Sequence, residues 1–306
     1  MSERIIRPLD ILPFFNVDMR YAIITNPASG NLTVARKRIA VAKAAEILNA
    51  PTFGLDTTSA EEFRQCAGDL SRLYDVIVIA GGDGTLSDII NTIDTTQTPI
   101  AYLPLGTGNA AYYALHYKGG LADIAMRIKK GAIHEYDLID CDGKRRAFMA
   151  SIGIEGTIIP LSEKYRADGA AGLRAYLKAV FNAYFHEYDR ISAEIVLDGS
   201  VFEVNNLLSL MVVKQPYYGF GMKVVPKARF DDRRLHIALF NSGLFKSVLG
   251  GLTAFSIGNR VGQYTTGYQL KVKLEKPLGL QIDGNKGWAS DAFNFRVLPK
   301  ALKIKC

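Results

Sequence analysis

The sequence predicts a doubly wound, parallel α/β domain followed by a second domain that is mostly antiparallel β. Short apolar, β-branched runs alternate with amphipathic helical patterns as far as Gly131, which is typical of a parallel sheet covered by helices. After about His134 most helical patterns give way to short strands separated by Asp-Gly or Gly turns. A chain of 306 residues that is 48% hydrophobic is long enough for two packed cores. We therefore expect an extension over residues 1–19 and domains over 20–133 and 134–306, with the last strand or tail free to pack back on the first domain.

The first half alternates strand and helix in a regular order. Residues 20–25 form the first expected strand, and the turn-forming segment 26–30 ends it. The nearly continuous apolar run over residues 75–80 predicts a strand buried on both faces. Apolar spacing predicts the remaining elements, which are helices over 34–48, 60–73, 86–93 and 121–130 and a strand over 100–103.

The second half is predicted to contain short strands, such as 190–197 and 207–213, and one long helix over 170–188. In that helix Tyr176, Val180, Tyr184 and Tyr188 recur every four residues, and such a stripe more often packs into a core than binds a ligand. Basic residues lie among apolar neighbours near the same helix. This pattern fits docking on a bilayer, but it is more common on an ordinary solvated face. The basic residues are Lys164, Arg166, Arg174 and Lys178.

The net charge of +7 suits nucleic acid, an anionic bilayer surface or a polyphosphate ligand. No RNP motif, helix-turn-helix or paired-Cys zinc module is present, so we expect no nucleic-acid partner. Cys66, Cys141 and Cys306 are an odd number at no metal-like spacing and follow no signal peptide, which favours a cytoplasmic location. The apolar stretch over residues 11–15 is too short to cross a bilayer, so we expect membrane contact to be peripheral, without a transmembrane segment.

Two glycine-rich segments follow neighbouring strands of the first half. Residues 81–85 are Gly-Gly-Asp-Gly-Thr, and residues 104–109 are Pro-Leu-Gly-Thr-Gly-Asn. Because the carboxyl ends of parallel strands meet at one sheet edge, the two loops should lie side by side. Glycines let backbone N–H groups approach phosphate oxygens, and a following helix directs its positive end at the same anion. The pattern favours a nucleotide site, with Asp83 facing Mg²⁺ or taking the proton of an attacking hydroxyl.

Together with Asn26-Pro27-x-Ser29-Gly30 after the first strand, these segments resemble the diacylglycerol kinase catalytic family, whose relatives include bacterial lipid kinases and sphingosine kinases. The likeness extends from about Arg20 to the end of the chain, through residues 136–138, 151–156, 219–226 and 283–284. It implies a nucleotide-binding α/β domain related to NAD kinases and phosphofructokinases, a β-rich domain that binds the lipid, and an active site in the cleft between them. The implied reaction is phosphoryl transfer from ATP–Mg²⁺ to a hydroxyl of diacylglycerol or a related lipid.

The resemblance also implies roles for individual residues. Asp83, Glu155 and Asp283 are the implied catalytic groups, although an Asp-Gly pair such as 283–284 is by itself more typical of a hairpin turn. Thr57 or Thr58 would touch the nucleotide from the side opposite the glycine loops. The remaining implied nucleotide contacts are Asn26, Gly81, Gly82, Gly84, Thr85, Ser87, Gly106, Thr107 and Asn109.

The chain departs from the family pattern at three places. The family's structural Mg²⁺ loop, usually Asp-Asp-Gly-x-Leu, corresponds to residues 231–235, so Asp232 and Leu235 join Asp83 as implied metal ligands. Arg233 replaces the glycine, which brings positive charge to the cation site and disfavours a positive φ. Asn285 stands where the family has Glu, and Ala110 where an acidic residue is common. Asp83 or Asp283 would then have to serve as the general base.

No Walker A, Gly-x-Ser-x-Gly or His-Glu-x-x-His motif competes with this interpretation. Three functions stay open. The chain could be a lipid kinase that is peripheral at the inner membrane face, a degenerate member that binds nucleotide or lipid without transfer, or a kinase of a soluble hydroxyl acceptor. The sequence names neither the lipid nor the donor nucleotide, and it is compatible with a homodimer as well as a monomer.

Overall fold

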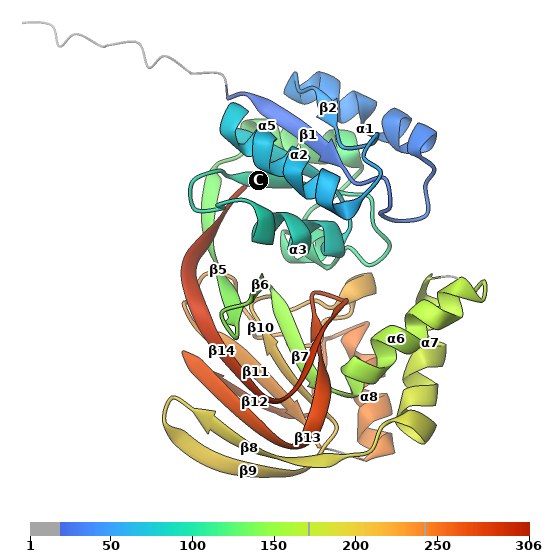
Figure 1. The fold of residues 1–306 in the computed structure, drawn as a ribbon, viewed down its shortest axis with the longest axis vertical. Helices are drawn as coiled ribbons and strands as arrows, with labels where there is room; N and C mark the ends of the chain where they lie inside the picture. The colour runs from blue at the N-terminus through green and yellow to red at the C-terminus, as the bar shows by residue number, and fades with distance from the viewer. Residues whose placement is uncertain (1–18, 171, 242) are drawn as a thin grey trace, which may run out of the picture.

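The computed structural model describes residues 19–170, 172–241 and 243–306, so the expected extension over residues 1–19 lies outside the described residues except for Met19. Figure 1 shows a helix-rich half stacked on a β-rich half, with the long strand β14 running between them. The predicted order of an α/β half followed by a largely antiparallel half is confirmed.

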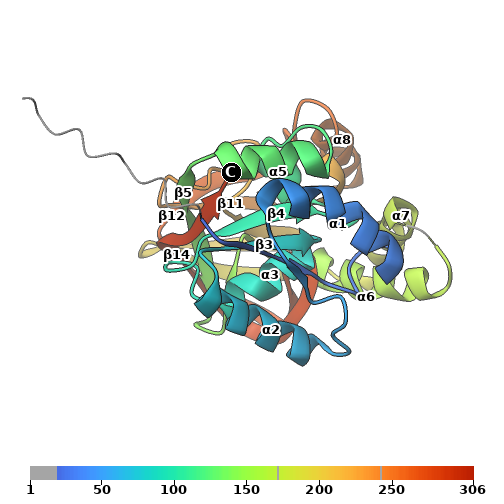
Figure 2. The same ribbon diagram turned by 90° about the horizontal axis from the view of Figure 1, so that it is seen from above.

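The first half is a parallel sheet with helices on both faces. The strands β1 (Tyr21–Thr25), β2 (Thr52–Phe53), β3 (Val76–Gly81) and β4 (Ile100–Pro104) lie in the order β2-β1-β3-β4. The helices α1 (Val34–Leu48) and α5 (Leu121–Lys130) cover one face, and α2 (Ala60–Leu73) and α3 (Asp83–Thr92) cover the other (Figure 2). A short helix, α4 (Ala110–Ala114), follows β4.

Strand order places the site. The chain goes from β1 outward to β2 and then returns to the other side of β1 for β3, so β1 and β3 flank the point where the direction of winding reverses. Loops that leave neighbouring strands at such a point run to opposite faces and leave a crevice at their carboxyl ends. Both strands are buried along their whole length, which explains their continuous apolar sequences.

The second half is a set of antiparallel pairings. Its helical segments are α6 (Ile154–Ala167), α7 (Gly172–Asn182), the π-helical turn η1 (Ala183–Glu187), the 3₁₀ turn η2 (Gly219–Gly221) and α8 (Leu244–Ala254). Its strands are β5 (Ile133–Cys141), β6 (Arg145–Ala147), β7 (Met149–Gly153), β8 (Ile191–Leu197), β9 (Ser200–Leu207), β10 (Ser209–Val213), β11 (Leu235–Phe240), β12 (Gln263–Gly267), β13 (Gln269–Ile282) and β14 (Asn285–Lys305).

The helices of the second half differ in part from the expectation. The helix expected over 170–188 is found as α7 and η1, and its tyrosine stripe packs against a buried cluster that contains Ala179 and Ala183, so the core-packing interpretation is confirmed. The helices α6 and α8 were not predicted from the sequence. Helix α6 contains Pro160 and α8 contains two adjacent glycines, and these residues weaken a helical pattern in sequence.

The two halves share their longest strands. Strand β14 pairs with β13 in the second half and with β5 along much of its length, and near its end Ile304 pairs with Ile100 of the parallel sheet. Leu302 and Ile304 are buried in the core of the first half. The last residues of the chain therefore add a strand to the first sheet, beside β4. The expected domain boundary between residues 133 and 134 falls inside β5 and remains a prediction.

Candidate active site

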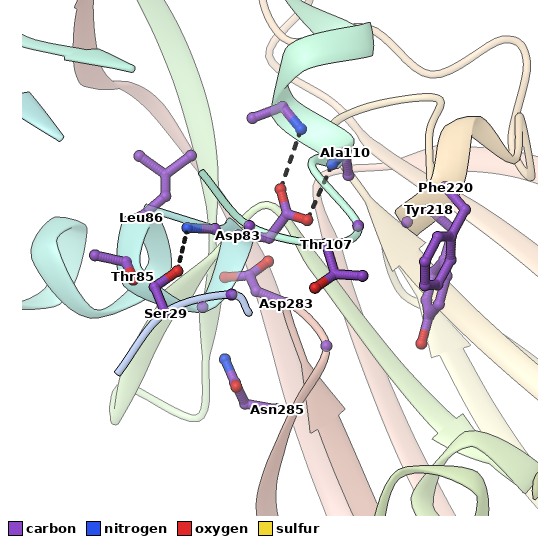
Figure 3. Close-up of a pocket in the computed structure, with 18 of the residues that line it drawn as sticks. Ser29, Asp83, Thr85, Leu86, Thr107, Ala110, Tyr218, Phe220, Asp283 and Asn285 are labelled. Atoms are coloured by element: carbon purple, nitrogen blue, oxygen red, sulfur yellow. Dashed lines mark hydrogen bonds between the residues drawn. The ribbon is translucent and has the colours of Figure 1, made fainter. Parts of the chain in front are cut away.

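A cavity of about 490 Å³ opens at the carboxyl ends of β1, β3 and β4. The loops that follow these three strands line one wall, and residues of the second half, including Met149, Gln215 and Asp283, line the other. The cavity thus lies at the edge of an open α/β sheet where ligands usually bind. Figure 3 shows the central part of this arrangement.

The two glycine loops touch each other at Gly82 and Gly106. A Cβ atom at Gly82 would lie 3.1 Å from the Cα atom of Gly106, and a Cβ atom at Gly106 would overlap the Cα atom of Gly82. The Leu105 N–H donates a hydrogen bond to the Gly81 carbonyl over 2.8 Å and fixes the spacing of the loops. A side chain at Gly106 would displace Gly82 and one at Gly82 would crowd Gly106, so bare backbone forms this part of the cavity wall.

The loop after β1 is held against the glycine loops by polar side chains. The Gly82 N–H donates to the Ser29 hydroxyl over 2.9 Å, and the Asn26 amide donates to the Thr85 hydroxyl over 3.1 Å. Behind the loop, the buried ammonium of Lys37 donates to the Asn26 and Pro27 carbonyls over 3.1 and 2.5 Å, and burial lowers its pKa. Lys37 supports the loop from behind and is not part of the cavity lining.

Asp83 is the first residue of α3, and its carboxylate caps the next helix of the cavity wall. Its two oxygens accept hydrogen bonds from the Ala110 N–H over 2.9 Å and the Ala111 N–H over 3.2 Å, at the start of α4 (Figure 3). Burial raises the pKa of Asp83, and these N–H groups partly offset that effect. The side chain lines the cavity, but its oxygens are turned toward α4.

Asp283 offers a different environment. It forms the two-residue turn between β13 and β14 with Gly284, and the φ angles of both residues are positive, at 48° and 82°. One oxygen, Oδ1, accepts from the Phe148 and Met149 N–H groups over 3.0 and 2.9 Å. The other, Oδ2, is buried without a well-aligned hydrogen-bond partner among the described residues. Burial raises the pKa of Asp283 to about 7, although Ser87 and the two N–H groups favour the charged form.

Glu155 does not line the cavity. It lies in the first turn of α6, buried, with Oε1 accepting from the Ser209 hydroxyl over 2.7 Å and Oε2 without a partner among the described residues. Burial raises its pKa to about 7. Besides burial, the negative charge of Glu155 raises the pKa of Tyr176 and of Tyr218, and both tyrosines line the cavity. Glu155 therefore lies behind the cavity wall.

The other expected contacts divide into two groups. Inside the cavity lining are Asn26, Gly82, Gly84, Thr85, Gly106 and Thr107. Outside it are Thr57 and Thr58, which bond to the Gly54 carbonyl and the Glu62 carboxylate, together with Gly81, Ser87 and Asn109. The Asn109 amide shapes its own loop instead, because it accepts from the Gly106 N–H over 3.1 Å and donates to the Gly106 carbonyl over 2.9 Å.

The second half contributes lining residues that the sequence analysis did not assign. Phe220, with a φ of 62°, donates its N–H to the Gly108 carbonyl over 2.8 Å and brings the turn η2 onto the second glycine loop. Tyr176 of α7 and Tyr218 face each other across this corner, with ring centroids 6.1 Å apart. The sequence signal for this corner is the pair of glycines around Phe220, within the segment 219–226 that shares the family likeness.

The residues of the expected metal loop are engaged by a lysine. The fully buried ammonium of Lys214 lies 2.8 Å from an Asp232 oxygen and 3.0 Å from an Asp137 oxygen, and it donates to the Arg234 carbonyl over 2.7 Å. Burial alone would raise the pKa of Asp232, but Lys214 holds it below its usual value. The Leu235 side chain lies in the hydrophobic core.

This lysine-centred cluster does not fit a divalent cation. The space between the carboxylates and the carbonyl already holds a positive charge, and a second one would be repelled. Arg233 adopts the positive φ of 59° that its position requires despite its side chain, and its N–H donates to Asp137. No cluster of three or more His, Cys, Asp or Glu side chains suited to a metal occurs in the described part of the chain.

The comparisons with known proteins agree with the fold and the motifs. A family model described as the diacylglycerol kinase catalytic domain matches residues 20–141, and one described as the YegS C-terminal NAD kinase beta sandwich-like domain matches residues 149–306. The fold and site therefore define a protein with the architecture of this kinase group. The chain belongs to the diacylglycerol kinase catalytic-domain family and carries the family's C-terminal domain.

Its sequence relatives are distant but nearly equal in length. The chain is 24% identical to a diacylglycerol kinase of Staphylococcus carnosus over 93% of this chain and 94% of the relative, and 25% identical to one of Staphylococcus saprophyticus over 88% and 89%. A solved diacylglycerol kinase structure from Bacillus anthracis is similar at a TM-score of 0.69, with 18% identity and coverage of 94% and 96%. An NAD kinase from Archaeoglobus fulgidus in complex with ATP is similar at a TM-score of 0.52, with 15% identity and coverage of 94% of both chains.

We predict that replacing Lys214 with Met will lower the free energy of unfolding by about 3–5 kcal/mol, because the buried carboxylate of Asp137 and the partly buried one of Asp232 lose the ammonium between them. The measurement is denaturant unfolding at neutral pH, with Lys271→Met on the exposed side of β13 as the matched control. Wild-type protein should unfold at the same denaturant concentration in EDTA and in Mg²⁺. A wild type that loses stability in EDTA would contradict the assignment of Lys214 as the built-in cation.

We predict that Glu155→Gln will raise the melting temperature above pH 7 by a few degrees and give no gain near pH 4. The reason is that the folded pKa of Glu155 is raised, so the folded state holds a proton that the unfolded state releases, and stability falls as the pH rises from about 4 to about 7. An amide cannot ionise and avoids this loss. If instead the variant were less stable at every pH, Glu155 would be a charged structural partner.

Proposed function

We propose that the protein is a lipid kinase that transfers the γ-phosphoryl group of ATP to the hydroxyl of diacylglycerol or a related lipid at a membrane surface. One observation carries the proposal. In a single cavity, two glycine loops touch each other through their backbones. Asp283, a buried carboxyl group whose pKa is raised to about 7, lines the same cavity. Membership of the diacylglycerol kinase family and the names of its relatives support it.

The glycine-loop wall suits the phosphates of the donor. Helix α3 begins at Asp83, directly after Gly82, so its positive N-terminal end points at the same crevice as the bare backbone of the loops. The similar NAD kinase was solved with ATP, which supports the same donor here. Because the Asp83 carboxylate is turned toward α4, we assign no magnesium to it, and Mg²⁺ that accompanies ATP would be held by phosphate oxygens and water, as is usual for this ion.

Asp283 suits the role of general base better than Asp83. Its Oδ2 atom has no well-aligned hydrogen-bond donor among the described residues, whereas both Asp83 oxygens already accept backbone N–H groups. As the lipid oxygen bonds to the γ-phosphorus, the bond to the β–γ bridging oxygen breaks, ADP leaves, and the hydroxyl proton passes to Asp283. Such transfer relies mainly on positioning and electrostatics, so one correctly placed base is sufficient.

The opposite side of the cavity suits an apolar acceptor. Ile159, Tyr176, Tyr218 and Phe220 line it, next to the thioether of Met149. These side chains can contact an acyl or alkyl chain over a large area without needing hydrogen bonds from it. They favour a lipid over a soluble polyol, whose hydroxyl groups would need partners.

We predict that Asp283→Asn will lower kcat for phosphoryl transfer by about 100-fold or more while the Kd for ATP changes little, because an amide cannot accept the proton. The assay follows labelled γ-phosphate from ATP–Mg²⁺ into micelles of diacylglycerol, sphingosine and phosphatidylglycerol, and into soluble polyols. Asp291→Asn, an equivalent change on the exposed side of β14, is the control.

The pH dependence of kcat provides a second test of the same role. A base must be deprotonated to act, so kcat should rise as the pH increases through about 7, the pKa to which burial raises Asp283. The Asp291→Asn control should keep this profile. Full activity of Asp283→Asn, or a wild-type rate that is flat from pH 5 to 9, would exclude Asp283 as the base.

A second candidate function is a degenerate family member that binds nucleotide or lipid without transferring phosphate. The observation behind it is Asn285, which replaces the family's glutamate and whose side chain lies against Gly84: a Cβ atom there would be 3.2 Å from Asn285 Oδ1. An amide at this place binds ligands but takes no proton. The two candidates share the cavity and differ only in chemistry.

We predict that Asn285→Glu will raise kcat by about tenfold or more if the wild type is a slow kinase, since it adds a carboxylate at the start of α3. Single-turnover transfer to the lipid that labels best is the measurement, with Asn285→Gln as the control for side-chain length. ATP binding without transfer in the wild type and in Asn285→Glu alike would favour the binding protein instead.

A further inference from the structure

Exposed large apolar side chains gather on two helical segments of the second half. Phe181 of α7 is 61% exposed, and Phe245 and Leu252 of α8 are 83% and 67% exposed, followed by Ile257 at 64%. Proteins rarely leave so many large apolar groups uncovered on neighbouring elements. Figure 1 shows α7 and α8 on the same side of the β-rich half, and both contribute to one buried cluster through Tyr176 and Ala254.

Helix α7 has two separate apolar faces. The face with Tyr176 and Val180 packs inward, as described above. The other face carries exposed side chains at a spacing of four residues, and its last two rings touch, with centroids 4.7 Å apart. This outer stripe consists of Leu173, Leu177 and Phe181 of α7 and Phe185 of the following turn η1. A stripe of this length on the outer side is unnecessary for the core and has no covering element among the described residues.

Helix α8 has the same character. Phe245, Leu249 and Leu252 are exposed along it, and Phe255 and Ile257 continue the apolar surface into the following turn. Among the described residues of α8, Gly250 and Ala254 are buried, and the Ala254 carbonyl accepts a hydrogen bond from the Lys223 N–H over 2.7 Å. The described large side chains of α8 therefore point away from the body of the protein.

The charged residues within α7 and α8 themselves are all basic, while Glu187 and Asp189 follow α7 in the chain. Arg174 and Lys178 lie on α7, Lys246 on α8 and Arg260 after it, while α7 and α8 contain no acidic residue and none occurs between Asp232 and Glu275. Basic groups beside large apolar side chains are what a surface needs to meet anionic headgroups and the acyl boundary beneath them. Two copies of this chain meeting through the same surface would bring like charges together.

The same helix also reaches the cavity. Gly172 and Tyr176 of α7 line it, and a Cβ atom at Gly172 would lie 3.5 Å from the Thr107 side chain of the second glycine loop. The cavity wall and the outer apolar stripe are therefore different faces of the same turns of α7. Contact of the outer stripe with a bilayer would therefore bring the cavity close to the lipid.

We propose that the exposed faces of α7 and α8, with their basic neighbours, dock on an anionic phospholipid bilayer and present the cavity to it. The proposal rests on the proposed function for the meaning of the cavity, but docking itself can be measured without any turnover. No described helix has the length and hydrophobicity to span a membrane, so docking here is attachment to the surface.

The test is co-sedimentation with vesicles of phosphatidylcholine alone or mixed with phosphatidylglycerol. Wild type should bind the mixed vesicles more tightly, and salt should weaken binding. Phe181→Ser and Phe245→Ser should each weaken it by about tenfold, because each removes a large apolar group from the docking surface. Arg174→Gln with Lys246→Gln should remove the preference for phosphatidylglycerol. Val201→Ser, 64% exposed on β9, is the matched control and should bind like wild type.

Activity on a short-chain diacylglycerol dispersed in detergent separates the two proposals. Docking variants should keep wild-type transfer to this acceptor and lose transfer to vesicle-borne lipid. Wild type that binds vesicles without phosphorylating either acceptor would refute the kinase and leave docking intact. Equal vesicle binding by wild type and both phenylalanine variants would overturn docking. Docking would also be overturned if wild type failed to bind vesicles and formed a dimer in sedimentation velocity that Phe181→Ser dissociates. The surface would then join two copies of the chain.

Discussion

The contact between Gly82 and Gly106 is the constraint on which the site depends. Neither position can carry a Cβ atom without moving the other loop, and the bond from Leu105 to Gly81 fixes their spacing. Neighbouring elements are held close to this contact by hydrogen bonds. The Ser29 hydroxyl accepts one from the Gly82 N–H, and the carboxylate of Asp83, the residue after Gly82, caps α4. The crevice at the β1–β3 switch point is therefore lined in part by closely packed backbone, a surface that suits phosphate oxygens.

The second half completes the cavity through a few defined attachments. The N–H of Phe220 bonds to the carbonyl of Gly108, and the turn at Asp283 is fixed to the backbone of Phe148 and Met149. Strand β14 leads from that turn to the core of the first half, so the position of Asp283 is coupled to the parallel sheet by continuous strand. Ion pairs of Lys214, the residue directly after β10, connect this strand to Asp137 of β5 and to Asp232 in the loop before β11. These contacts involve no metal ion.

Much of the first half could be predicted because its signals are local. Continuous apolar runs identify buried parallel strands, and glycines directly after them identify the sheet edge that binds ligands. The second half was less predictable. Helix α6 contains Pro160 and α8 an adjacent glycine pair, so their helical form depends on packing rather than on propensity.

Individual site residues were predictable only where the chain itself brings them to the sheet edge. Asp83 and Thr107 follow β3 and β4 directly and do line the cavity. Glu155 lies behind Tyr176 and Tyr218, and its place depends on how α6 and α7 pack. The pairing of Lys214 with Asp137 and Asp232 joins three distant segments, and no local pattern announces it.

A crystal structure with a non-hydrolysable ATP analogue and Mg²⁺ tests the central claim most directly, because it locates the triphosphate. The account predicts phosphate oxygens against the backbone of Gly82, Gly84 and Gly106, with the γ-phosphate facing Asp283. A nucleotide bound elsewhere, or a γ-phosphate turned away from Asp283, would contradict it.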